Sequence, residues 1–419
     1  MSLALAPLAD ASRCAPADEL CQRIHRLEPA LPIRPLFQEN RATPCLTDSV
    51  CLPAIHVLTG WHMLHEEGIV RWMAQHPLIE IRSGGGCFNL WKDHLGAAAD
   101  WVKSWGGPPA NDSTRIAAVN CAAKTLTWHP EYAGRYWTAA ATLFERCKSN
   151  TTSAQCGHLQ QQQPGKAAPS GADPRLSTHT ELIGNGGVGH EATPPFVMRA
   201  LYGRHVRLIV ALRSPVDRIE TAFWFHKQFW AVKGPSADGL HAYATEQVAG
   251  FRRCEAMHSS RRCAFLFERL SRDQADVFWH CNQIIRGLYH PFIAEWRAAF
   301  PSELLVLRVE DVFGEPALTS ARLSRFLSLP THLAPHVSSP LLRRTYAEWH
   351  VASLNVSCCG GGRGEPEPMR SETRRLLTSF YAPFNQALAA LLDDPSFEAW
   401  RAADWRPIDL RTVSDSGRS

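Results

Sequence analysis

The chain has 419 residues, of which 45% are apolar and 20% are charged, so it can bury a sizeable core and is not disordered throughout. Its formal net charge of +4 is too small for a dedicated nucleic-acid-binding protein, and we expect no nucleic-acid partner. Its 13 cysteines include no Cys-x-x-Cys pair, which argues against a zinc site, and we expect no bound metal.

Residues 1–50 are rich in proline, alanine and cysteine, which predicts an irregular, cysteine-containing arm. The first ten residues lack the basic start and apolar run of a signal peptide, and no membrane anchor is visible in the sequence. Three glycosylation sequons and two closely spaced cysteine pairs nevertheless favour an oxidising, secretory compartment. These are Asn111, Asn150, Asn355, Cys147 with Cys156 and Cys254 with Cys263. Either a targeting segment is missing from this sequence or the secretory interpretation is wrong, and we favour the first.

The first predicted strand is the apolar run from Pro53 to Leu58, which ends at a Thr-Gly pair containing Gly60. Apolar residues with helical spacing follow, and a His-Pro pair at residues 76 and 77 ends that helix. A second strand is predicted at residues 116–119, before a loop that contains Lys124. Between residues 157 and 178 the sequence is dominated by Gln, Pro, Gly, Ala and Ser, so we expect a flexible insertion there.

The strongest predicted strand runs from His205 to Leu212, and its apolar residues suit a central parallel strand that is covered on both faces. A helix follows at once. We expect Ser214 as its N-cap, Pro215 as its first helical residue and Asp217 as the acid of its first turn, with one apolar face along the helix.

The remaining elements are a strand at residues 303–307 and helices at residues 317–327 and 371–392. Strands that alternate with helices predict an α/β protein with a mostly parallel sheet flanked by helices. Ligands bind such sheets at the carboxyl ends of the strands. We therefore expect one main domain over residues 51–395 and a tail over residues 396–419.

Arg213 stands where chemistry is expected, between the strongest strand and its capped helix. Its guanidinium, the free backbone N–H groups of the helix start and the hydroxyl of Thr221 two turns along would surround an anion. This combination predicts a phosphate pocket. The alternative is a buried structural arginine that ties the strand end to a neighbouring acid.

The segment from Leu212 to Arg218, which reads Leu-Arg-Ser-Pro-Val-Asp-Arg, resembles together with Thr221 the 3'-phosphate-binding motif of sulfotransferases. Stretches within residues 287–307, 310–312, 326–329 and 362–388 are similar, in order and spacing, to further blocks of the heparan and chondroitin sulfotransferase branch. The resemblance implies the sulfotransferase fold, a P-loop-like parallel sheet flanked by helices. It also implies that the sulfate donor PAPS (3'-phosphoadenosine 5'-phosphosulfate) is the co-substrate.

The same resemblance assigns candidate PAPS-binding residues. Arg213 and Thr221 fall on the arginine and serine that bind the 3'-phosphate. Gly60 falls on the first glycine of the 5'-phosphosulfate loop, and Gly362 and Arg363 fall on the late Lys-Gly-Arg loop.

The sequence departs from the family around the reacting sulfuryl group. Residues 63–67 read Met-Leu-His-Glu-Glu where the family has Lys-x-Gly-Thr-Thr, and the Lys-Glu pair that supplies the family's base is absent. A carboxylate about 4 Å from a phosphate is repelled by roughly 4 kcal/mol at an effective dielectric constant of 20. His62 and His65 are the nearest replacements for the base, and Lys124 for the missing positive charge. These three are the candidate catalytic residues.

Two hypotheses of different classes follow. The first is a PAPS-dependent sulfotransferase of the Golgi lumen that acts on a hydroxyl of a glycan, whose sugar would contact Trp224, His226 and Lys227. The second is a catalytically inactive protein of the same fold that binds a glycan or an adenosine 3'-phosphate ligand. A P-loop kinase is disfavoured because no Gly-x-x-x-x-Gly-Lys-Ser/Thr run exists.

Overall fold

The computed structural model describes residues 37, 41–47, 50–58, 67–82, 108–118, 195, 202–257, 260, 263–264, 283–333, 346–355, 365–398 and 400. Their centre is a sheet of five parallel strands in the order β4-β5-β3-β6-β7. The strands are β3 (Ile55–Leu58), β4 (Ile79–Arg82), β5 (Arg115–Ala118), β6 (Arg207–Leu212) and β7 (Leu304–Arg308). The prediction of an α/β protein with a mostly parallel sheet is confirmed.

Nine α-helices lie within the described ranges. They are α2 (Glu67–Gln75), α8 (Pro215–Phe225), α9 (Lys227–Lys233), α10 (Ala237–Glu255), α13 (Tyr289–Ala299), α14 (Val309–Gly314), α15 (Pro316–Phe326), α16 (Tyr346–Leu354) and α17 (Ser371–Leu392). Two 3₁₀ turns are η5 (Thr331–Leu333) and η7 (Pro395–Phe397). The bounds of α17 match the sequence prediction, and those of α15 match it within one residue. Helix α2 ends at Gln75, directly before the predicted stop at residues 76 and 77.

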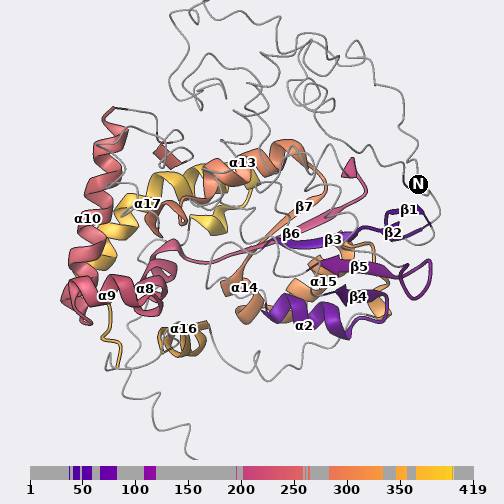
Figure 1. The fold of residues 1–419 in the computed structure, drawn as a ribbon, viewed down its shortest axis with the longest axis horizontal. Coiled ribbons are helices and arrows are strands. Elements are labelled where there is room, and N and C mark those ends of the chain that lie inside the picture. Colours follow the sequence, from indigo (N-terminus) through magenta and orange to yellow (C-terminus); the bar gives the residue numbers. More distant parts are fainter. Residues whose placement is uncertain are drawn as a thin grey trace, which may run out of the picture.

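Helices cover both faces of the sheet (Figure 1). The strand period of two sends alternate residues of β6 to opposite sides. Leu208 and Val210 pack in one core cluster with residues of α13 and α17, whereas Ile209 and Ala211 pack in another with residues of α2 and α15. This two-sided burial explains why β6 is the most continuous apolar run in the sequence.

The start of α8 forms as the sequence predicts, but the rest of the helix is more buried. Ser214 is the N-cap, its Oγ accepts from the backbone N of Asp217 at 3.4 Å, and Pro215 opens the helix. All residues from Pro215 to Trp224 are buried. The expected apolar face is present, since Val216, Ile219 and Phe223 pack in one core cluster. The polar side of α8 is buried as well, because α16 and α17 cover it.

The end of the N-terminal arm is ordered by a short antiparallel pair, β1 (Cys45–Thr47) and β2 (Val50–Cys51). A disulfide joins Cys45 to Cys51, and a second joins Cys254 to Cys263 as the sequence predicts. The Cys147–Cys156 pair, most of the arm and the insertion at residues 157–178 lie outside the described residues. The domain limits at residues 50 and 395 stay predictions.

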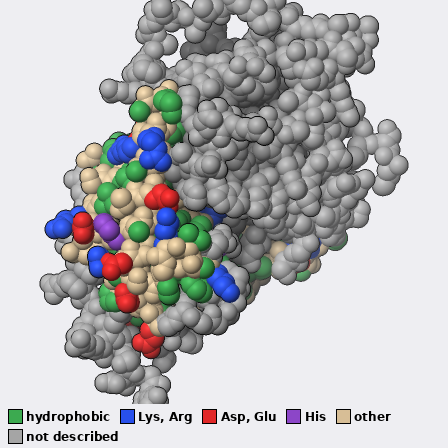
Figure 2. All heavy atoms as spheres, turned by 60° about the vertical axis from the view of Figure 1, so that its left-hand side comes forward, with side chains coloured by type: hydrophobic (Ala, Val, Ile, Leu, Met, Phe, Trp, Pro, Cys, Tyr) green, Lys and Arg blue, Asp and Glu red, His purple; other side chains and the backbone are tan. Residues whose placement is uncertain are grey.

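The helical side of the molecule carries a mixed surface. Figure 2 shows basic and acidic side chains interspersed with apolar ones on the side where α9 and α10 lie. Ion pairs join Lys233 to Glu246 at 2.7 Å and Arg370 to Asp238. No helix in the described ranges has the length and apolar character needed to cross a membrane.

Candidate functional site

Arg213 directly follows β6, and Thr221 lies on the second turn of α8, so a single strand–cap–helix unit positions both side chains. The Nη2 atom of Arg213 donates to the Oγ1 atom of Thr221 at 3.3 Å. The Thr221 hydroxyl in turn donates to the backbone oxygen of Asp217 at 3.0 Å. The structure thus brings these two candidate residues together at the carboxyl end of the sheet, where a ligand of a parallel sheet is expected.

Helix α16 covers the Arg213 guanidinium. The Nη2 atom lies 2.7 Å from Nδ1 of His350, and the guanidinium carbon lies 4.7 Å from the centre of the Trp349 ring. Arg213 is consequently 0% exposed. The sequence prediction missed α16, although Tyr346, Trp349 and His350 have the i, i+3, i+4 spacing that would have indicated a helix.

The contact with Arg213 fixes the hydrogen-bonding roles of His350. A guanidinium can only donate, so Nδ1 of His350 accepts and Nε2 carries the ring proton. Nε2 lies 3.0 Å from the Oε2 atom of Glu220 and donates to it. The histidine therefore links the Arg213 guanidinium to a buried carboxylate.

Arg374 of α17 supplies a second positive charge to the same group. Its Nη1 atom lies 2.9 Å from Oδ1 of Asp217, and its Nη2 atom lies 3.5 Å from Oε2 of Glu220. The Tyr346 hydroxyl donates to Oδ2 of Asp217 at 3.0 Å. We call Arg213, Asp217, Glu220, His350 and Arg374 the carboxyl-end cluster.

Charges in the carboxyl-end cluster hold its aspartate ionised. Burial raises the pKa of the Asp217 carboxyl, but nearby positive charge, which includes the Arg374 and Arg213 guanidinium groups, outweighs that effect and lowers the pKa to about 2. Burial likewise lowers the pKa of the Arg213 guanidinium, but Tyr346 and the neighbouring acids raise it above its usual value. Both side chains are thus charged at neutral pH.

Asp217, Glu220 and His350 are of the types that ligate metals, and one atom from each lies within 4.8 Å of the others. The atoms in question are already engaged, since both carboxylates accept from Arg374 and the histidine bonds to Arg213 and Glu220. The guanidinium groups of Arg213 and Arg374, which bond directly to these three residues, would also repel a cation. These residues therefore fit an ion-pair network better than a metal site, and the absence of a metal stays a prediction.

The backbone N–H groups at the start of α8 are not all free, which corrects one expectation. The amide of Ser214 donates to Oε1 of Glu310 at 2.8 Å, and the amide of Asp217 is taken by the Ser214 hydroxyl. Glu310 is the first acid of the Glu-Asp-Val segment on α14, and burial raises the pKa of its carboxyl. An acid of the chain itself thus takes one of the N–H groups that we expected to be free for an anion.

The other predicted residues are placed as follows. Gly60, His62, His65, Lys124, Gly362 and Arg363 lie outside the described residues. Of the three expected sugar contacts, Lys227 is exposed and His226 is half-buried at the end of α8. The prediction is wrong for Trp224, because its side chain is fully buried in a core cluster with residues of α8 and α10.

Comparison with known proteins supports the motif-based resemblance. Over 220 residues the chain is 29% identical to carbohydrate sulfotransferase 15 from Mus musculus, Rattus norvegicus and Homo sapiens. The chain is a relative of the carbohydrate sulfotransferases. The match covers 50% of this chain but only 34% of the length of each relative.

Two further comparisons add little to this sequence match. No family model matches the chain. A solved sulfotransferase structure from Alicyclobacillus acidocaldarius aligns over 84% of this chain and 99% of its own length, with 13% identity and a TM-score of 0.41. A TM-score at that level carries no argument about a shared fold, so the relationship depends on the sequence match.

Proposed function

We propose that this protein transfers a sulfuryl group from PAPS to a hydroxyl of a glycan. The observation that carries the proposal is the contact of Arg213 with Thr221 at the carboxyl end of β6, in a chain related to carbohydrate sulfotransferases. In this proposal Arg213 and Thr221 bind the 3'-phosphate, and Gly60, Gly362 and Arg363 hold the rest of the donor.

The reaction is an in-line displacement at sulfur. The acceptor oxygen attacks the sulfur, the bond to the bridging phosphate oxygen breaks, and a base takes the proton of the acceptor hydroxyl. We propose His62 or His65 as that base and Lys124 as the positive charge that stabilises the bridging oxygen as it leaves. The 3'-phosphate keeps its charge throughout, so Arg213 contributes to donor binding rather than to the chemical step.

One observation favours the second function, a catalytically inactive binding protein. Within the carboxyl-end cluster Arg213 is fully buried and its Nη2 atom already bonds to Thr221 and His350. A 3'-phosphate must displace His350 from Nη2, which requires α16 to shift. This cost weakens donor binding, and the chain also lacks the Lys-Glu pair that supplies the family's base, so the two together favour binding without transfer.

We further propose that the protein works in the lumen of the secretory pathway, in the Golgi. The Cys45–Cys51 and Cys254–Cys263 disulfides support this location, because such bonds persist in oxidising compartments and are rare in the cytosol. The exposed Asn111 of one sequon lies in a turn that a glycan could reach.

Ligand discrimination tests the 3'-phosphate assignment. Calorimetry would compare 3'-phosphoadenosine 5'-phosphate with adenosine 5'-monophosphate, which lacks the 3'-phosphate. We expect Thr221→Val to weaken binding of the first about 10-fold and to leave the second unchanged, because one hydrogen bond to a charged group is lost. Thr319→Val is the matched control, since Thr319 is also buried on a helix with its hydroxyl bonded to a backbone oxygen.

A transfer assay separates the two functions. The purified protein is incubated with radiolabelled PAPS and a panel of glycans. Label on any acceptor supports the enzyme. Preference for the 3'-phosphorylated nucleotide without any transfer supports the inactive binding protein. If wild type shows no such preference, or if Thr319→Val has the same effect as Thr221→Val, the nucleotide site is not at Arg213 and both functions lose their basis.

A further inference from the structure

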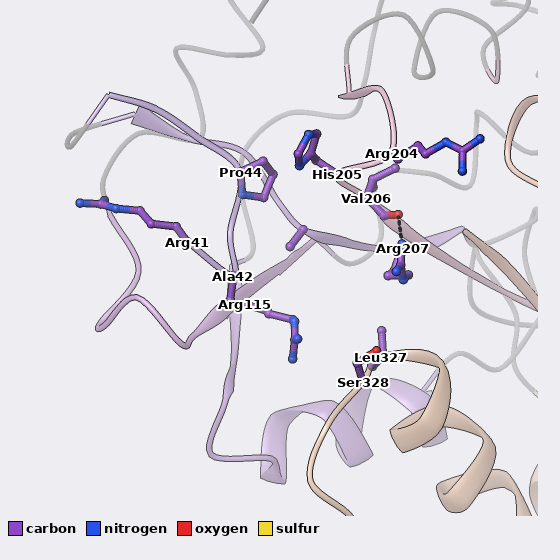
Figure 3. A pocket seen from close by; sticks show the side chains of 11 residues that line it. Arg41, Ala42, Pro44, Arg115, Arg204, His205, Val206, Arg207, Leu327 and Ser328 are labelled. Atoms are coloured by element: carbon purple, nitrogen blue, oxygen red, sulfur yellow. Dashed lines mark hydrogen bonds between the residues drawn. The ribbon is translucent and has the colours of Figure 1, made fainter. Parts of the chain in front are cut away.

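A second group of arginines lies at the opposite, amino end of the sheet, around a pocket that no predicted site residue lines. Figure 3 shows this pocket from close by. Its lining includes the residues just before or at the start of three neighbouring strands and the end of α15. They are Arg41, Ala42, Pro44, Ala54, Arg115, Arg204, His205, Val206, Arg207, Leu327 and Ser328.

Strand register places Arg115 and Arg207 on the same face of the sheet. Arg207 is paired with Ile55 of β3, and Ile55 is paired with Ala117 of β5. Arg115 stands two residues before Ala117, and the period of two returns its side chain to the face that Ala117 shares with Arg207. One strand and an offset of two residues separate them, so their backbones are about 12 Å apart. Two side chains as long as arginine can converge across that distance.

The small residue between these arginines leaves the space open. Ala54 immediately precedes β3, and its backbone is held between the neighbouring strands: its amide donates to Ile116 and its oxygen accepts from Arg207, both at 2.8 Å. In Figure 3, Arg115 and Arg207 point toward the same space above Leu327 and Ser328. We call this space the amino-end pocket.

Within the described ranges, the two convergent arginines have no acidic partner. Among the described residues, the side chain of Arg115 makes no hydrogen bond or ion pair, and no acid lines the pocket. Arg207 donates to the backbone oxygen of Val206 at 3.3 Å and lies 5.9 Å from the Phe326 ring. Burial, and then the like charge of Arg207, lower the pKa of Arg115. The pocket therefore concentrates positive charge that the protein does not neutralise there.

The other two arginines of the lining differ from this pair. Arg41 lies 3.3 Å from Asp112, and Arg204 lies 4.0 Å from Glu303. Figure 3 shows both side chains extending away from the space between Arg115 and Arg207. They provide controls of the same residue type at the same pocket.

A hydroxyl joins the pair at an unusual backbone position. Ser328 follows the end of α15 with a φ of 51°, in the left-handed region that favours glycine. The backbone there closes the helix, since Leu329 N donates to Ser324 O at 2.8 Å. A serine in this position costs of order 1 kcal/mol of strain relative to glycine, and it places an O–H donor in the lining.

We propose that the amino-end pocket binds a tetrahedral oxyanion, a sulfate or phosphate group, between Arg115 and Arg207 with the Ser328 hydroxyl as a further donor. Such an anion supplies the counter-charge that the pair lacks and accepts the forked hydrogen bonds that guanidinium groups make. The site stands apart from the proposed PAPS site, because it lies at the other end of the strands and shares no residue with it.

Thermal denaturation and calorimetry of the full chain test this site. Sodium phosphate, sodium sulfate and a sulfated oligosaccharide are compared with sodium chloride at the same ionic strength, which removes general screening. We expect each oxyanion to raise the melting temperature of wild type above its value in chloride. Arg115→Gln and Arg207→Gln should each weaken phosphate binding about 10-fold, whereas Arg204→Gln should leave it unchanged.

A second readout does not depend on a ligand. If Arg115 and Arg207 repel each other, Arg115→Gln in chloride should melt at the same temperature as wild type or higher. A structural role for Arg115 predicts a lower melting temperature instead, which would overturn the proposal. So would an equal loss of phosphate binding in Arg204→Gln, or no oxyanion effect on wild type.

The ligand series identifies the source of the anion. Tightest binding of the sulfated oligosaccharide assigns the pocket to an ester group on a glycan, and tightest binding of inorganic phosphate or sulfate assigns it to the free ion. Binding of 3'-phosphoadenosine 5'-phosphate should be equal in wild type and Arg115→Gln. Failure of the Arg213 site and failure of this pocket are therefore distinguishable.

Discussion

The arginines at the two ends of the sheet have opposite charge environments. At the carboxyl end, Arg213 and Arg374 share the protein interior with Asp217 and Glu220, so their charges are balanced within the chain. At the amino end, Arg115 faces a cavity that another arginine lines, and no acid lines it within the part of the chain that the structure describes. The arginine that carries the recognisable motif is thus the less available one. The local balance of charge, rather than the motif, determines where an incoming anion gains the most electrostatic stabilisation.

Binding of an anion therefore requires different changes at the two ends. At the carboxyl-end cluster it competes with His350 for a hydrogen bond that already exists. At the amino-end pocket it would offset the like charges of Arg115 and Arg207. Binding at the first end therefore requires rearrangement, and binding at the second requires only the loss of water.

The largest expected contrast is in stability. Arg213→Met removes one partner of a buried, hydrogen-bonded charge network, and we expect the free energy of unfolding to fall by about 3–5 kcal/mol. Arg115→Met removes a cation without a partner and should change it by less than about 1 kcal/mol. Urea denaturation in chloride buffer measures both. Equal losses in the two variants would contradict the distinction between the ends.

The next prediction concerns pH at the carboxyl-end cluster. Because the pKa of Asp217 in the folded protein is lowered to about 2 from 3.8, the carboxylate stabilises the fold above pH 4, and this contribution disappears as the pH falls through 2. It amounts to about 2 kcal/mol. The stability difference between wild type and Asp217→Asn should therefore shrink by that amount between pH 5 and pH 2. A constant difference across this range would mean that Asp217 is not held ionised by its neighbours.

The smallest expected effect is at the amino-end pocket. Ser328→Gly relieves the left-handed backbone strain and should stabilise the protein by about 1 kcal/mol, while oxyanion binding weakens through loss of the hydroxyl. The reverse substitution, Gly203→Ser, should destabilise the protein by a similar amount. Gly203 has a φ of 57°, and an added Cβ would have room there. Thermal denaturation of both variants checks this pair, and a destabilised Ser328→Gly would contradict it.

Much of the fold could be predicted from local sequence. The continuous apolar run of β6, the Ser-Pro start of α8 and the helical spacing of α17 each determine their element through nearby residues. The strand β4 was missed because Ile79 and Ile81 alternate with charged residues over only four positions, a pattern too short to distinguish from a loop. The helix α16 was missed although Thr345 and Glu348 have the spacing of a capping box at its start.

The candidate site divides in the same way. The contact between Arg213 and Thr221 spans eight residues and follows from one strand, one cap and two helical turns, so the sequence by itself determined it. The other groups around Arg213, namely Glu310, His350 and Arg374, come from α14, α16 and α17, about 100 to 160 residues farther along the chain. Likewise, Arg115 and Arg207 meet only because β3 pairs between β5 and β6. Tertiary structure alone decided these meetings, because pairing between distant segments depends on strand order and packing, which no local pattern of residues records.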